Sequence, residues 1–234
     1  MMPDDVLTAF VIGVTIVAYV VSREVFLRTH LTLLNPVFVS TVAIILVLLA
    51  FGIRSEQYTP GRDLMTRLLG PATVALAVPL YRHRRLLVTY WASMALGIVC
   101  GSVATVVTVV LFARWASLDR MLVLAVAPKS VSTPVAIEIA RIVGTNVSIT
   151  AGLVVATGMV GAVMGPRLLT ALGISDPVAR GVAIGTTSHA TGTAAILHEG
   201  ETQGAMSAIA MALTAIFMAF AGPFLIPWLM VVGS

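Results

Sequence analysis

The chain has 234 residues, of which 59% are hydrophobic and only 10% are charged, and its formal net charge is +4. Average soluble domains carry about 25% charged residues, so this composition excludes a soluble globular protein. The apolar residues extend along the whole length, and no basic stripe interleaved with aromatic residues indicates nucleic-acid binding. We therefore expect one all-α integral membrane domain over residues 1–234, in contact with lipid.

Stretches of about 20 apolar residues are long enough to cross a bilayer as helices. By this criterion the sequence predicts about eight membrane segments. The third and seventh start at Thr59-Pro60 and Ser175-Asp176-Pro177, because a cap followed by proline is a typical helix start. We expect the sixth to end before Gly165-Pro166. The eight segments cover residues 6–21, 31–53, 60–81, 86–113, 118–143, 147–164, 175–197 and 205–231.

Two pairs of glycines lie four residues apart in apolar segments, Gly97 with Gly101 and Gly161 with Gly165. This spacing lets helix backbones approach closely in a membrane. We expect packing within one bundle, and a homo-oligomer contact is the alternative.

The fifth segment contains the chain's only lysine, Lys129, between two prolines. Prolines interrupt a helix, and a charge at membrane depth is costly, so a broken helix with a lone cation indicates a site for a small anion. Thr133 before Pro134 predicts a cap that restarts the helix, whose N-terminal N–H groups would face an anion. Ser130 and Ser132 add hydroxyls. The alternative is that Lys129 extends to a membrane interface.

Glu138 lies in the same segment and has two interpretations. It is a candidate counter-ion of Lys129, with a possible role in proton coupling, or it pairs with Arg141 three residues later on the same helix face.

The seventh segment gathers hydroxyls and a histidine between two glycines, Gly185 and Gly192. Glycine allows the backbone to leave the helix, and hydroxyls can satisfy the groups that a break exposes, so we expect a second broken helix here. His189 could bind substrate, carry a proton or make a structural hydrogen bond. The candidate substrate-binding residues of this segment are Thr186, Thr187, Ser188, His189, Thr191 and Thr193.

Two interrupted segments in corresponding positions are typical of transporters with inverted repeats. Residues 70–78 can be aligned with residues 127–135, both apolar and interrupted by proline, although the match is short enough to arise by coincidence. The halves would be about residues 31–113 and 118–231.

The sequence contains no motif that indicates an enzyme. The chain has no glycine-rich phosphate loop, no zinc-ligand spacing and no catalytic triad, so we expect no cofactor, no metal and no enzyme activity. Lys129 beside Ser130, or His189 beside Ser188, could suggest an intramembrane hydrolase, but neighbouring residues of a helix do not face each other.

The chain resembles the LrgB/CidB family of bacterial membrane proteins. The resemblance covers nearly the whole chain and is strongest after residue 120. It rests on three stretches and on Glu199-Gly-Glu201 with Gly204-Ala-Met-Ser207. The stretches are Ala127-Pro-Lys-Ser-Val-Ser-Thr-Pro-Val-Ala136, Thr157-Gly-Met-Val-Gly-Ala-Val-Met-Gly-Pro166 and Gly185-Thr-Thr-Ser-His-Ala-Thr-Gly-Thr193.

The resemblance implies a multi-pass protein of the bacterial cytoplasmic (inner) membrane and two competing functions. One is holin- or antiholin-like regulation of murein hydrolase export and cell lysis, with a small LrgA/CidA-like partner. The other is solute transport, since members are associated with pyruvate and a related plant plastid protein exchanges glycolate and glycerate. That plant protein joins an LrgA-like part to an LrgB-like part, and this chain has only the second.

Our first hypothesis is a secondary transporter of small 2-hydroxy or 2-oxo monocarboxylates, such as glycolate, glycerate, pyruvate or lactate, by alternating access. Lys129 would hold the carboxylate, the hydroxyls of both broken segments would contact the neighbouring oxygen, and H⁺ or Na⁺ would be the coupling ion. The alternative is the lysis regulator, which requires oligomerisation more than an interior cation.

Overall fold

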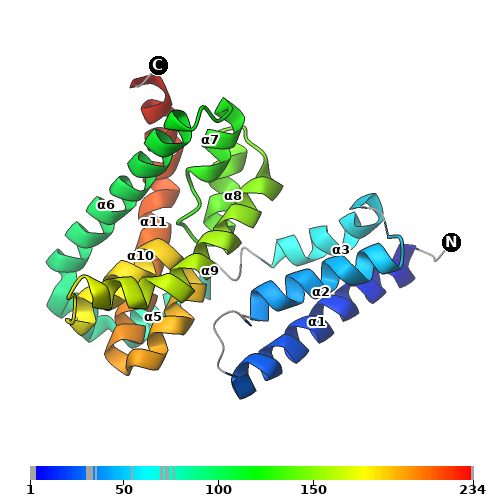
Figure 1. Ribbon diagram of the computed structural model, residues 1–234, viewed down its shortest axis with the longest axis horizontal. Helices are drawn as coiled ribbons and strands as arrows, with labels where there is room; N and C mark the ends of the chain where they lie inside the picture. Colours follow the sequence, from blue (N-terminus) through cyan, green and yellow to red (C-terminus); the bar gives the residue numbers. More distant parts are fainter. Residues whose placement is uncertain are drawn as a thin grey trace. The chain divides into compact units, whose positions relative to one another are not determined.

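The computed structural model describes residues 4–29, 34, 36–53, 55–68, 71, 74–75 and 77–232. Every regular element among these residues is a helix, as the sequence predicts (Figure 1). The chain divides into two units, Met1–Ala72 and Thr73–Ser234.

The first unit consists of α1 (Asp4–Thr29), α2 (Pro36–Ala50) and α3 (Ser55–Arg67). α1 packs against both other helices. α3 is polar and contains Pro60 in its interior, so the prediction that a membrane segment begins at Pro60 is wrong. Four residues of the aligned repeat at residues 70–78, namely 70, 72, 73 and 76, lie outside the described residues.

The described residues of the second unit form three long helices and several shorter elements. The long helices are α6 (Arg84–Trp115), α9 (Val147–Ala171) and α11 (Glu201–Val232). The shorter elements are α5 (Ala77–Arg82), α7 (Arg120–Val126), α8 (Thr133–Ile142), α10 (Pro177–Ile196) and the 3₁₀ turn η2 (Leu197–Glu199).

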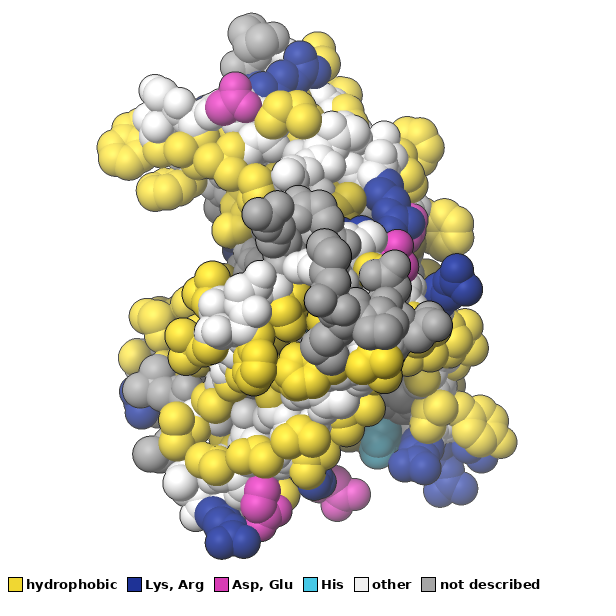
Figure 2. Space-filling view, turned by 90° about the vertical axis from the view of Figure 1, so that its right-hand side faces the viewer, with side chains coloured by type: hydrophobic (Ala, Val, Ile, Leu, Met, Phe, Trp, Pro, Cys, Tyr) yellow, Lys and Arg dark blue, Asp and Glu magenta, His cyan; other side chains and the backbone are white. Residues whose placement is uncertain are grey.

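Four helices of the described residues are long and apolar enough to cross a membrane, namely α1, α6, α9 and α11. A shorter apolar helix covers Phe38–Ala50. Large apolar side chains are exposed, among them Trp115 and Phe224 at 81% and 78%, and hydrophobic atoms cover wide areas of the face in Figure 2. The chain is therefore a multi-pass membrane protein, but eight membrane segments are not confirmed.

The sixth predicted segment is longer than expected, because α9 continues through Pro166 to Ala171. The expected end at Met164 is wrong. Proline is tolerated inside membrane helices where neighbouring helices cover the interruption, and α9 packs along α10 at this point.

The fifth predicted segment folds back on itself as a helical hairpin. α7 enters, residues 127–132 turn, and α8 returns, so that the Thr145 hydroxyl donates a 2.7 Å hydrogen bond to the carbonyl of Met121. α7 has 7 residues and α8 has 10, and at about 1.5 Å per residue neither arm can span the roughly 30 Å of hydrocarbon. We call residues 120–142 hairpin 1 and residues 127–132 its tip.

The seventh predicted segment is a second hairpin. Its helix breaks at His189, where φ is +38° and ψ is −137°. The two arms then run back together, because Arg180 on the first arm binds Glu199 after the second, and Ile184 and Ile196 are buried in one cluster. The predicted break between Gly185 and Gly192 is confirmed. We call residues 177–199 hairpin 2 and His189 its tip.

The two hairpins enter the helical bundle from opposite ends. Hairpin 1 brings the chain back to the level of the C-terminal end of α6. α9 then runs from that level to the base of hairpin 2, where Arg180 donates a hydrogen bond to the Pro166 carbonyl. α11 then runs back, and Arg114 at the end of α6 donates to the Met230 carbonyl near the end of α11. α6 and α11 therefore end on the same side, opposite the base of hairpin 2.

Small residues bring the neighbouring helices close to α10. A Cβ atom on Gly97 or Gly101 of α6 would lie 3.3 or 3.2 Å from the side chains of Val182 and Thr186. On α9, Gly161 and Gly165 leave space only for Ser188 and Ile184. Packing of both glycine pairs within the bundle is thus confirmed.

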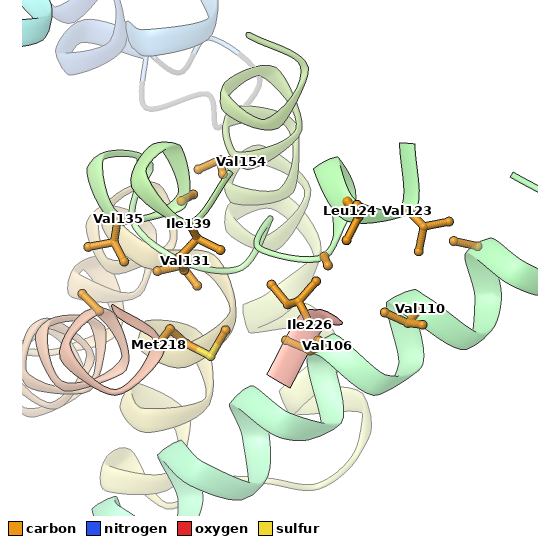
Figure 3. Packing of buried hydrophobic residues seen from close by; sticks show 14 residues of the cluster. Val106, Val110, Val123, Leu124, Val131, Val135, Ile139, Val154, Met218 and Ile226 are labelled. Carbon is orange, nitrogen blue, oxygen red and sulfur yellow. The ribbon is translucent and has the colours of Figure 1, made fainter. Parts of the chain in front are cut away.

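The tip of hairpin 1 is held by an apolar cluster with members from α6, α7, α8, α9 and α11. Figure 3 shows Val131 of the tip among Val106, Met218 and Ile139. This packing fixes the turn between α7 and α8 inside the bundle.

Candidate functional site

The tips of the two hairpins meet inside the second unit. The Nε2 atom of His189 lies 3.3 Å from the backbone carbonyl oxygen of Lys129, which it reaches by donating a hydrogen bond. His189 is only 5% exposed, and Gly158 of α9 provides the space for its ring. The two segments that the sequence singled out are therefore in direct contact, although 60 residues separate them.

The carbonyl groups that the break in hairpin 1 frees find side-chain partners. Helix ends leave their last carbonyls without intrahelical donors, and hydrocarbon offers no replacement. Thr150 of α9, which is fully buried, donates to the carbonyl of Ala125, and His189 donates to that of Lys129. Hydrogen bonds from the side chains of α9 and hairpin 2 therefore stabilise the interruption at residues 127–132.

Lys129 lies at the tip of hairpin 1 and is partly buried. Its ammonium group donates to the hydroxyl of Ser130 at 3.3 Å, and no acidic side chain among the described residues forms an ion pair with it. A partly buried cation without a counter-ion favours an anionic ligand, because unpaired charge inside a protein is costly.

The N-terminus of α8 begins at the same tip. Ser132, rather than Thr133, is the residue that caps it, and Thr133 is the first helical residue, so the predicted cap is one residue off. The Ser132 hydroxyl makes no capping hydrogen bond and is buried without a partner. The free N–H groups of α8 add a partial positive charge near Lys129.

Glu138 does not form an ion pair with the ammonium group of Lys129. It binds Arg141 at 3.1 Å, and both side chains are more than half exposed. The structure therefore agrees with the second interpretation of Glu138, the ion pair with Arg141.

The hydroxyls of hairpin 2 divide into two groups. On the first arm, Thr187 donates to the carbonyl of Ala183 and lies 3.2 Å from Ser188, whereas Thr186 is buried without a partner. On the second arm, Thr193 shares a 2.8 Å hydrogen bond with Ser207 of α11. Thr191 lies against Gly158 of α9.

The sequence reading missed two features. One is the base of hairpin 2, where Arg180, only 7% exposed, makes two hydrogen bonds to Glu199 at 2.7 and 2.6 Å. The other is a set of hydroxyls from α6 and α11, including Ser102 and Thr214, that face the hydroxyls of the two hairpins. Isolated hydroxyls in long apolar helices carry no pattern that would single them out.

A groove of about 520 Å³ runs between α6 and the first arm of α10. Tyr90 and Asp176 line one part of it, and Thr186 and Thr187 another. Its volume is within the range of small-molecule sites, which is roughly 300–1,000 Å³. The groove brings space for a ligand to the hydroxyls of hairpin 2.

Comparison with known proteins identifies one family. The model of the LrgB-like family matches residues 15–228. The uncharacterized protein YxaC of Bacillus subtilis is 35% identical over 97% of this chain and 99% of its own length. The holin-like protein CidB of Staphylococcus epidermidis is 32% identical over 91% of this chain and 93% of its own length. The antiholin-like protein LrgB of Bacillus mycoides is 30% identical over 94% and 96%. No solved structure matches the chain significantly.

Proposed function

We propose that this chain, which belongs to the LrgB-like family, is a secondary carrier of small 2-hydroxy or 2-oxo monocarboxylates in the bacterial cytoplasmic membrane. The observation that carries the proposal is the contact between the two hairpin tips, His189 to Lys129. Interrupted membrane helices that meet near the middle of a bundle are the typical ligand sites of secondary transporters.

The chemistry of the tips favours an anion with further oxygen atoms. Lys129 supplies a full positive charge without an acidic partner among the described residues, and the N-terminus of α8 supplies a partial one. The hydroxyls of Ser130, Ser132 and Thr186 can donate to the carboxylate and to the adjacent hydroxyl or carbonyl of the acid. The protein performs no reaction on the acid and moves it by alternating exposure of the tips to the two sides.

The opposite orientations of the hairpins support alternating access. Each tip is reached from a different end of the bundle, so a ligand between the tips can be released toward either side when one hairpin or its surrounding helices move. Protons or sodium ions are the coupling ions to be tested, and His189 is a candidate proton carrier.

The experiment is uptake of radiolabelled pyruvate, glycolate, glycerate and lactate into proteoliposomes that contain this chain, under imposed proton or sodium gradients. Lys129→Met should lower saturable uptake by about tenfold or more, because the ligand loses a charge-assisted hydrogen bond. Lys129→Arg, which keeps the charge, is the control and should retain more uptake. Wild-type rates in well-folded Lys129→Met protein would contradict the carrier proposal.

A second candidate function is favoured by the names of two relatives, a holin-like and an antiholin-like protein. In this role the chain would regulate lysis by forming or controlling a membrane lesion, together with an LrgA/CidA-like partner. Leakage of a fluorescent dye from vesicles, independent of any carboxylate and unaffected by Lys129→Met, would favour this function over the carrier. Absence of uptake that is restored by an LrgA-like partner would instead indicate a two-component carrier.

A further inference from the structure

Three buried hydroxyls without hydrogen-bond partners line the same small cavity. They belong to Ser102 of α6, Thr186 of hairpin 2 and Thr214 of α11, which are 4%, 3% and 2% exposed. We call this cavity, whose walls also include Thr105 and Ser130, the hydroxyl pocket. Buried hydroxyls are normally satisfied, so their convergence on one space indicates a polar occupant.

The size of the hydroxyl pocket limits the occupant. Its volume is about 10 Å³, which is room for one particle of the size of a water molecule. A carboxylate oxygen is of this size, but a whole carboxylate is not. The rest of any larger ligand must therefore lie outside the pocket.

The charges around the pocket select against a cation. None of the described residues that line it is acidic, and the Lys129 ammonium group donates to the hydroxyl of Ser130 in its wall. Hydroxyl groups can donate hydrogen bonds, and bonds from donors to an ionised oxygen are the strong ones. These features fit an oxygen atom that carries negative charge.

The pocket adjoins a space that can hold the rest of the ligand. Thr186 lines both the hydroxyl pocket and the groove between α6 and α10, and the wall of the groove at this point includes Gly101. The groove is bordered mainly by apolar side chains and glycines, which suit a short carbon skeleton. The pocket and the groove thus meet at Thr186.

We propose that the hydroxyl pocket binds one carboxylate oxygen of the transported acid through Ser102, Thr186 and Thr214, with the carbon skeleton of the acid in the groove. This inference rests on the proposed carrier function and extends the substrate site to α6 and α11, which contain none of the substrate-binding residues predicted from the sequence.

The test uses Thr214→Val and Ser102→Ala, two variants on different helices that remove a hydroxyl with little change in shape. Thr108→Val is the control, because Thr108 lies on α6 but is exposed and donates to the carbonyl of Ala104 in its own helix. Each protein is measured for the KM of pyruvate and glycolate uptake in proteoliposomes. Protection from thermal unfolding by pyruvate is compared with that by pyruvamide, its uncharged analogue.

We expect the KM for both acids to rise about 10- to 100-fold in Thr214→Val and Ser102→Ala, the loss typical of a hydrogen bond to a charged group. Protection by pyruvate should fall in parallel, while pyruvamide protects no protein. The unfolding temperature without ligand should not fall, since each variant replaces an unpartnered hydroxyl by an apolar group. Thr108→Val should behave as the wild type.

The outcomes separate the two proposals. Saturable uptake by the wild type with unchanged KM in both pocket variants would overturn the assignment of the pocket and leave the carrier function intact. Unchanged KM with a lower unfolding temperature would overturn it in favour of a structural water. If the wild type neither takes up nor is protected by either acid, the carrier function fails and the pocket assignment fails with it.

Discussion

Gly161 of α9 is the position where a single methyl group should disturb the candidate site most directly. A Cβ atom there would lie 1.9 Å from the Oγ and 2.5 Å from the Cβ of Ser188, the residue before the tip of hairpin 2. Carbon atoms in contact are about 3.5–4.0 Å apart, so the backbone near Ser188 must move by roughly 1 Å. The neighbouring hydrogen bond from His189 to the Lys129 carbonyl is already 3.3 Å long and should be lost.

The size of the effect follows from a matched variant on the same helix. A Cβ on Gly152 would meet nothing within 4 Å, so Gly152→Ala should stabilise the protein by about 0.5–1 kcal/mol through lower backbone entropy in the unfolded chain. Gly161→Ala has the same entropic gain, but the added methyl group overpacks the contact between α9 and Ser188, which costs about 1–3 kcal/mol. The difference between the two variants isolates the clash and corresponds to roughly 2–12 °C in unfolding temperature for a chain of this size.

The measurement is thermal unfolding of the purified variants in detergent, with pyruvate uptake recorded for the same proteins. Adding Ser188→Gly to Gly161→Ala removes both clashing atoms of Ser188 and should recover part of the loss, whereas Ser188→Ala removes only the Oγ, keeps the Cβ at 2.5 Å and should recover less. Equal unfolding temperatures for Gly152→Ala and Gly161→Ala, or equal effects of the two Ser188 substitutions, would refute the packing described for α9 and hairpin 2.

Two further predictions concern other supports of the hairpins. Glu199→Gln should destabilise the protein by about 2–4 kcal/mol, because the buried Arg180 loses its charged partner. Glu138→Gln is the control, since it breaks only an exposed ion pair and should change stability by less than about 1 kcal/mol. Equal losses of stability in thermal unfolding would contradict the burial of the Arg180–Glu199 pair. Thr150→Val should cost about 1–3 kcal/mol, because the carbonyl of Ala125 loses its side-chain donor. An unchanged unfolding temperature would show that the hydroxyl donates to its other acceptor, the carbonyl of Asn146 in its own helix, which also lies 3.1 Å away.

The sequence was most informative where residues violate the usual rules of a membrane helix. Lys129 between two prolines and the hydroxyl-rich stretch around His189 both predicted breaks, and both segments are interrupted in the structure. The glycine pairs predicted close packing, because only glycine lets two backbones approach within contact distance. The roles assigned to the hydroxyls and to Lys129 in binding remain predictions.

The direction of the chain after each break could not be derived from local sequence. A break that continues across the membrane and one that turns back have the same prolines, glycines and hydroxyls. The difference lies in long-range contacts, such as Arg180 with Glu199 and Thr145 with the carbonyl of Met121. For the same reason α9 runs through Pro166, since the packing of α10 against it outweighs the local signal to stop.

The close fit of hairpin 2 against α11 also has a consequence for synthesis and membrane insertion. Gly181 and Gly185 lie directly against the backbone of α11 at Gln203 and Ser207, and Thr193 bonds to the same serine. During translation these surfaces have no partner until α11 has emerged from the ribosome and entered the membrane. A ribosome stalled before residue 201 would therefore hold a chain whose second hairpin lacks its contacts with α11.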